Sequence, residues 1–165
     1  MALETRITET ATPLDAFDFR WDVETEILAG RADVPSGGSG FSGSWELESD
    51  LGSVVTLETS DGVLCGIEVV VWPDVEEPPK LVAPHDAKPA RVVLLPPGDA
   101  PSGVLEIETP ISAVAATADS LIHLVFGPAR TRALRVAQNV IADLDSAGRL
   151  TGLWLMDLPP FPQGG

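Results

Sequence analysis

The chain has 165 residues, a mass of 17.3 kDa, 44% hydrophobic residues and a net charge of −15. This length is that of one domain, with enough apolar residues for a sizeable core. The 15 Gly and 15 Pro argue against a bundle of long helices, and the single cysteine, Cys65, excludes an internal disulfide and a cysteine-built zinc site. No apolar run approaches the ~20 residues of a membrane helix and residues 1–5 show no signal-peptide pattern, so we expect a cytoplasmic protein.

The negative charge is uneven along the sequence. Residues 1–80 hold 17 acidic and 4 basic residues, whereas residues 81–165 hold 8 acidic and 6 basic residues. Such a surface repels phosphate backbones, so nucleic-acid binding is not expected. The acidic half could face a basic protein partner, or the charge could serve solubility alone. The bias of 8 Arg over 2 Lys is typical of a GC-rich bacterial source.

The first half of the chain has the periodicity of β-strands. Residues 1–13 are polar and predict an N-terminal tail or an edge strand. The Gly- and Ser-rich stretch 35–40 predicts a flexible loop, and Asp61-Gly62 predicts a tight hairpin turn between two β-prone runs. Strands are predicted over residues 17–23, 45–48, 54–58 and 64–72, which alternate apolar with polar residues or are rich in β-branched ones.

The second half begins with a proline-rich segment. Residues 73–90 contain five prolines and predict an extended linker across the surface. Residues 111–118 are ambiguous from their pattern. Further strands are predicted over residues 91–95, 104–108 and 121–126.

The stretch 129–147 supports two interpretations. Its apolar residues Leu134, Ala137, Val140, Ile141 and Leu144 lie at helical spacing, and Gly148 could end such a helix. An internal repeat favours strands instead. Residues 54–69 align with 140–155 at one offset that matches both glycine pairs, Gly62 with Gly148 and Gly66 with Gly152.

The repeat also includes an expected strand before each of the two aligned ranges. Phe19-Arg20-Trp21 aligns with Ile122-His123-Leu124 as an upstream strand, although the spacing there differs. We therefore expect two meander-like repeats within one compact domain. The expected parts are the tail 1–13, repeat one over 14–75, the linker and additional strands over 76–118, repeat two over 119–158 and a C-terminal tail over 159–165.

The second copy resembles a short bacterial domain family of unknown function, whose hallmark is Asp-x-Asp-x-x-Gly-x-x-x-Gly-Ile-Glu. The matching residues run from Asp143 to Trp154, with Leu153-Trp154 in place of Ile-Glu. The first copy has Ile67-Glu68 at that place but lacks the paired Asp. The resemblance implies a small antiparallel β-meander with no assigned activity, in which 139–145 is a strand, 145–148 a turn and 149–157 the return strand.

No catalytic set or cofactor motif is recognised in the sequence. Asp143 and Asp145 lie two residues apart on one strand face, and with Asp157 they are weak candidates for a hard cation. The alternative is that Asp145 caps its own turn and Asp143 is solvated. No metal site is therefore predicted.

Several residues are candidates for a ligand or partner surface. Trp72 and Trp154 end equivalent return strands. They either pack at the boundary of a core or lie at the rim of a pocket between the repeats. A cluster of four arginines in the second half could bind an anion or an acidic partner, or pair with the protein's many carboxylates. The candidate surface consists of Trp72, Trp154, His123, Arg130, Arg132, Arg135 and Arg149.

The sequence predicts an all-β protein of about ten antiparallel strands, arranged as a sandwich or flattened barrel with little helix. Three functions remain open. The first is a non-catalytic, acidic protein-interaction module with a basic partner. The second is a small-molecule-binding barrel or cofactor-free enzyme, and the third is a self-associating structural subunit such as a homodimer.

Overall fold

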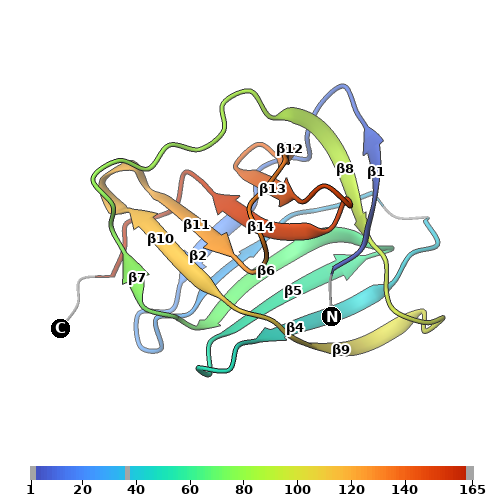
Figure 1. Ribbon diagram of the computed structural model, residues 1–165, viewed down its shortest axis with the longest axis horizontal. Helices are drawn as coiled ribbons and strands as arrows, with labels where there is room; N and C mark the ends of the chain where they lie inside the picture. The colour runs from blue at the N-terminus through green and yellow to red at the C-terminus, as the bar shows by residue number, and fades with distance from the viewer. Residues whose placement is uncertain (1–2, 36–37, 163–165) are drawn as a thin grey trace.

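The computed structural model describes residues 3–35 and 38–162, and within these ranges it contains fourteen strands and one short 3-10 helix. Strands account for 51% and helix for 2% of the molecule, so the all-β prediction is confirmed. All strands belong to one sheet, whose main path of eleven strands curls into a half-barrel (Figure 1). The described part of the chain has no helix long and apolar enough to cross a membrane.

The strands of the first half are β1 (Thr5–Glu9), β2 (Asp18–Trp21), β3 (Leu28–Arg31), β4 (Ser42–Glu48), β5 (Val54–Ser60), β6 (Val63–Val71) and β7 (Val75–Glu76). Those of the second half are β8 (Lys88–Leu94), β9 (Ser102–Glu108), β10 (Ser112–Ala116), β11 (Leu121–Val125), β12 (Arg132–Ala137), β13 (Val140–Leu144) and β14 (Leu150–Leu155). The 3-10 helix, Thr117–Asp119, lies between β10 and β11.

Two groups of five strands pair in the same order. In the first group β2 pairs with β3, β3 with β6, β6 with β5 and β5 with β4, all antiparallel. In the second group β10 pairs with β11, β11 with β14, β14 with β13 and β13 with β12, again antiparallel. Strand β9 extends the first group parallel to β4, and β8 extends the second parallel to β12. The groups join at β8, whose Val93 bridges Val63 of β6.

Both hairpins expected from the glycine-containing turns are present. Asp61 and Gly62 have φ values of 52° and 83° between β5 and β6, and Gly148 has a φ of 79° between β13 and β14. Glycine adopts this left-handed region readily because it lacks a Cβ atom. The helical interpretation of 129–147 is wrong, because β12 and β13 pair along their length there.

Other expectations need correction. Of the tail and the edge strand expected for residues 1–13, the strand is present, because residues 5–9 form β1, antiparallel to β8, and Leu3 is buried. The expected linker contains β7 and the start of β8. Phe19-Arg20-Trp21 lies in β2, whereas the strand that pairs with β6 as β11 pairs with β14 is β3. The parts of the expected loop and tails at residues 1–2, 36–37 and 163–165 lie outside the described residues.

The core lies inside the curl of the sheet. Its largest fully buried side chains are Trp45, Phe41, Leu28, Leu47, Leu57, Ile67, Leu94, Ile122, Leu124, Leu144 and Leu153. A second, smaller cluster of Leu121, Ile141 and Trp154 lies on the other face of β11, β13 and β14, because successive strand residues point to opposite faces. Leu81, Ala83 and Ala87 of the proline-rich segment pack against this outer cluster.

Candidate functional site

A buried carboxylate, Asp143, lies at the centre of the outer cluster. Its neighbours Ala142 and Leu144 on β13 belong to the main core, so the alternation of the strand sends Asp143 to the outer face. The residue is only 3% exposed. An ionised carboxylate is costly to bury unless charges or donors surround it, so its partners decide whether this position is tolerated.

Three candidate residues from the sequence surround Asp143. His123 Nε2 on β11 lies 2.6 Å from Asp143 Oδ2, and Trp154 Nε1 on β14 donates to Asp143 Oδ1 at 3.1 Å. The imidazole stacks on the indole, with ring centroids 3.7 Å apart and an interplanar angle of 8°. Arg130 Nη1 lies 3.8 Å from Oδ1, and its Cζ is 5.7 Å from the Trp154 ring. The carboxylate is therefore satisfied by two ring N–H groups and one nearby cation.

A glycine on β14 makes room for this network. Gly152 pairs with Asp143, and a Cβ atom there would lie 2.9 Å from Asp143 Oδ2 and 2.8 Å from Leu124 O. Only hydrogen fits at this position, so the aspartate side chain can extend across β14 towards β11. A hydrogen-bonded Asp–His pair is also the arrangement of a general base. Neither residue lines either of the two largest cavities described below, so the geometry favours a structural pair.

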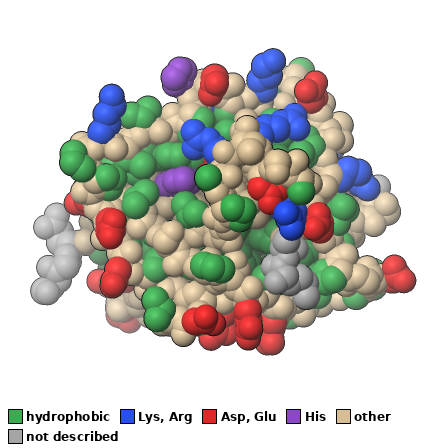
Figure 2. All heavy atoms as spheres, viewed as in Figure 1, with side chains coloured by type: hydrophobic (Ala, Val, Ile, Leu, Met, Phe, Trp, Pro, Cys, Tyr) green, Lys and Arg blue, Asp and Glu red, His purple; other side chains and the backbone are tan. Residues whose placement is uncertain are grey.

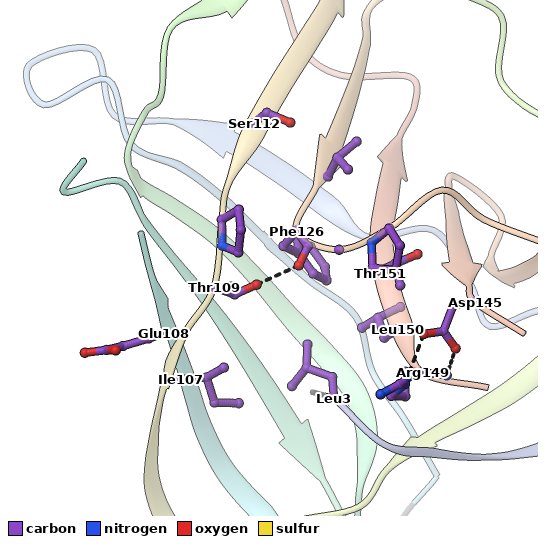
Figure 3. A pocket seen from close by; sticks show the side chains of 14 residues that line it. Leu3, Ile107, Glu108, Thr109, Ser112, Phe126, Asp145, Arg149, Leu150 and Thr151 are labelled. Carbon is purple, nitrogen blue, oxygen red and sulfur yellow. Dashed lines mark hydrogen bonds and ion pairs between the residues drawn. The ribbon is translucent and has the colours of Figure 1, made fainter. Parts of the chain in front are cut away.

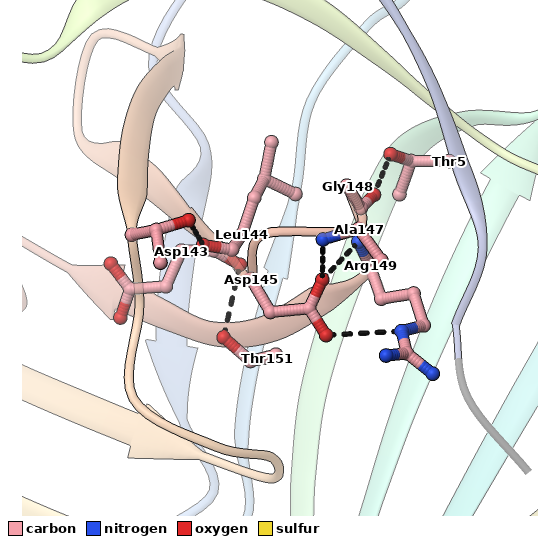
Figure 4. Close-up of polar contacts among 9 residues, drawn as sticks. Thr5, Asp143, Leu144, Asp145, Ala147, Gly148, Arg149 and Thr151 are labelled. Atoms are coloured by element: carbon pink, nitrogen blue, oxygen red, sulfur yellow. Dashed lines mark hydrogen bonds and ion pairs between the residues drawn. The ribbon is translucent and has the colours of Figure 1, made fainter.

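Asp145 has a different role, two residues further along. Its Oδ1 accepts from the backbone N–H groups of Ala147 and Arg149, both at 2.9 Å, and its Oδ2 accepts from Arg149 Nε at 3.0 Å (Figure 4). The backbone N–H of Arg149, followed by that of Ala147 and by the guanidinium charge, lowers the pKa of Asp145 below its usual value. Thr5 donates to the Gly148 carbonyl and ties β1 to the same turn.

The weak cation candidates do not form a site. Asp143 is bound to His123 and Trp154, Asp145 caps its own turn, and Asp157 is exposed beyond β14. Among the described residues no three His, Cys, Asp or Glu side chains are grouped closely enough to hold a metal ion.

A cleft of about 470 Å³ lies where the β9–β10 connection meets the β13–β14 turn (Figure 3). Its apolar walls are Leu3, Ile107, Phe126 and Leu150, each at most 4% exposed. The Asp145–Arg149 pair forms its polar side. The pocket thus has the size and the apolar lining common in small-molecule sites.

The remaining candidate residues lie elsewhere. Trp72 stacks on Trp21, with ring centroids 5.7 Å apart, and donates to the Glu26 carbonyl. Arg135 donates to the Gln138 carbonyl. Arg132 joins Arg130 and Lys88 around a polar cavity of about 450 Å³, which Glu9 and Asp86 also line. The seven residues of the predicted surface therefore do not come together in one place.

An acidic groove, formed by Glu46 and Glu48 of β4 and Glu106 and Glu108 of β9, was not singled out in the sequence. These strands are parallel and in register, so Glu46 lies beside Glu106 and Glu48 beside Glu108. All four side chains are exposed and line a groove of about 360 Å³. Figure 2 shows several acidic side chains side by side along the lower border of the molecule, where no basic side chain is visible.

Compared with known proteins, the chain matches no family model and no curated protein. The resemblance to the short bacterial β-meander family therefore stays a prediction. The geometry of the molecule itself carries the functional argument.

Proposed function

We propose that this protein is a non-catalytic interaction module that docks a basic, extended protein segment along the acidic groove of β4 and β9. The observation that carries the proposal is the in-register parallel pairing of Glu46 with Glu106 and of Glu48 with Glu108. Neighbouring strands lie about 4.8 Å apart, so like charges are held side by side at a cost that a cationic partner would relieve. No ion pair joins these four glutamates to a Lys or Arg among the described residues.

The free edge of β9 supports an extended partner. Strand β9 ends the sheet path with β4 as its one neighbour among the described strands, so a row of its backbone N–H and C=O groups faces outward. An added strand can pair with such an edge, while alternate side chains give specificity. Lys or Arg at every second position of that strand would meet the glutamates of the groove.

The same charges argue against the alternative of self-association through β9. Pairing two copies edge to edge would bring Glu106 and Glu108 of one copy close to the same residues of the other. Nucleic acid is disfavoured for the same reason, because phosphates would meet carboxylates.

A defined peptide tests the proposal. The probe is a peptide of about ten residues that alternates Lys with Val, titrated into the isotope-labelled protein by NMR at about 20 mM and about 300 mM salt. We expect amide shifts concentrated in β9 and β4, and binding weakened about tenfold or more at the higher salt. A Glu/Val peptide of the same length is expected to leave the spectrum unchanged.

Paired variants separate a specific groove from general attraction. The variant E46K/E106K should lose binding, whereas E24K/D74K, with the same change in net charge at exposed positions outside the groove, should retain it. Equal loss in both variants, or peptide shifts that avoid β4 and β9, would overturn the proposal.

We infer further that the groups β2–β6 and β10–β14 are two copies of one five-strand unit, related to the β-meander family and folded towards each other as a flattened sandwich. Their identical pairing order supports this inference. In each copy an acidic side chain opposite a glycine pairs with a base on the neighbouring strand. Glu58 faces Gly66 and pairs with Arg31 at 2.9 Å, just as Asp143 faces Gly152 and pairs with His123.

A further inference from the structure

In the cleft beside the β13–β14 turn, apolar walls and a charged group come together. Its walls are buried side chains from four parts of the chain, including Leu3 at the N-terminus and Phe126 after β11. Leu3 is held there because Leu150 N–H donates to its carbonyl at 2.9 Å. The walls are therefore fixed by backbone pairing, and a ligand would meet a preformed surface.

Arg149 supplies a directed cation at the cleft. Its Nε donates to Asp145 Oδ2, and Asp145 is itself held by two backbone N–H groups, so the guanidinium plane has a fixed orientation. No other partner of the guanidinium is recorded among the described residues, and the side chain is 42% exposed. Its two Nη groups are available to a bidentate anion.

We propose that this cleft binds a small molecule with an apolar body and a single carboxylate, which Arg149 holds at the polar side. The body would contact Ile107, Phe126 and Leu150, and the volume of about 470 Å³ lies within the ~300–1,000 Å³ of ordinary ligand pockets. This site is separate from the acidic groove, and neither proposal depends on the other.

The free Nη groups of Arg149 favour a ligand with one carboxylate. A cation is disfavoured because both oxygens of Asp145 already accept hydrogen bonds, and the Glu108 side chain points away from the cleft in Figure 3. A phosphate dianion is disfavoured because the cleft offers one arginine against its two negative charges, in a protein of net charge −15. A carboxylate matches the guanidinium in charge and in planar geometry, whereas an uncharged ligand would leave the oriented Nη groups without a partner.

Two pairs of probes test the assignment on the wild-type protein. Octanoate is compared with 1-octanol, and 2-naphthoate with 2-naphthalenemethanol, by methyl and amide NMR shifts. We expect at least one carboxylate to bind with a Kd of about 1 mM or tighter, with shifts at Leu3 and Leu150, and its alcohol to bind about tenfold more weakly. Absence of shifts with both carboxylates, shifts elsewhere, or equal affinity for acid and alcohol would each overturn the proposal.

A matched pair of variants checks the role of the arginine. Arg149→Ala keeps the backbone bonds of the turn and should weaken the bound carboxylate about tenfold while leaving its alcohol unchanged. Arg132→Ala removes the same charge from an exposed position outside the cleft and should leave both probes unaffected. Unchanged carboxylate affinity in Arg149→Ala, with its folding checked by the melting temperature, would contradict the assignment.

Discussion

At the scale of single residues, the most constrained position is Asp143. Its carboxylate has two ring N–H partners and lies near Arg130, while Gly152 leaves room for it across β14. The sequence suggested His123, Trp154 and Arg130 as candidates but gave no reason to group them around one aspartate. The grouping depends on which strands pair, and β11 reaches β14 only through contacts between distant parts of the chain. One clue in the sequence is Gly152, two residues before Trp154. A glycine inside a strand often marks a place where another group comes close to the backbone.

Removing this carboxylate should destabilise the protein. Asp143→Ala leaves the Nε1 of Trp154 and the Nε2 of His123 without their partner, and we expect the free energy of unfolding to fall by about 3 kcal/mol. Urea denaturation followed by circular dichroism measures the change. Asp119→Ala, at an exposed position in the 3-10 helix, should change the stability by less than about 0.5 kcal/mol. Similar values for the two variants would contradict the structural importance of Asp143.

Cys65 should be a poor nucleophile. Burial raises the pKa of its thiol, and the negative charge of Glu58 raises it further, whereas Arg31 opposes this effect. Because a raised thiol pKa favours the neutral form, we expect slow alkylation by iodoacetamide at about pH 8. Glu58→Gln should accelerate the reaction, as followed by mass spectrometry, and Glu106→Gln on β9 should not. Rapid alkylation of the folded wild-type protein would refute this prediction.

At the scale of elements, predictions succeeded where turn chemistry is local. Asp61-Gly62 and the Asp145–Gly148 turn fix their hairpins within a few residues, so both could be predicted. Strand β12 was obscured because the apolar residues of β12 and β13 happen to fall at helical spacing. Strand β3, Leu28–Arg31, does not alternate apolar with polar residues and was missed.

The β13–β14 turn should make stability depend on pH. The pKa of Asp145 is lowered in the folded protein, so its ionised form stabilises the fold above the unfolded value of about 3.9, and this stabilisation is lost as the pH falls through the folded pKa. Asp145→Asn should therefore melt below the wild type at about pH 7, and the difference should shrink towards about pH 3. The melting temperatures of both proteins across this range measure the effect. A difference independent of pH would show that the charge of Asp145 is not responsible.

At the scale of the whole molecule, the acidic groove of β4 and β9 is the main charged feature. Composition indicated an acidic first half, but only the parallel pairing of β4 with β9 brings glutamates from both halves of the chain into one groove. The alternation of apolar and polar residues predicts that β4 and β9 are strands, but it does not show that they pair with each other. The sequence could predict the charge and the strands, and it could not predict the groove.

The charged edge should keep the protein monomeric. We expect light scattering after size exclusion to give the monomer mass of 17.3 kDa at physiological salt, because copies approaching through β9 repel each other. The variant E106Q/E108Q should associate as its concentration rises, whereas the matched pair E24Q/D74N should stay monomeric. A stable wild-type dimer would instead support self-association.

The pairing of Leu3 with Leu150 has a consequence for biosynthesis. Leu3 takes its place only after Leu150 has been synthesised, since Leu150 donates to it and β1 is tied to the Gly148 turn. Strand β8, with which β1 pairs, is likewise synthesised well after β1. Residues 3–9 are thus secured late in folding, because their partners are made long after them.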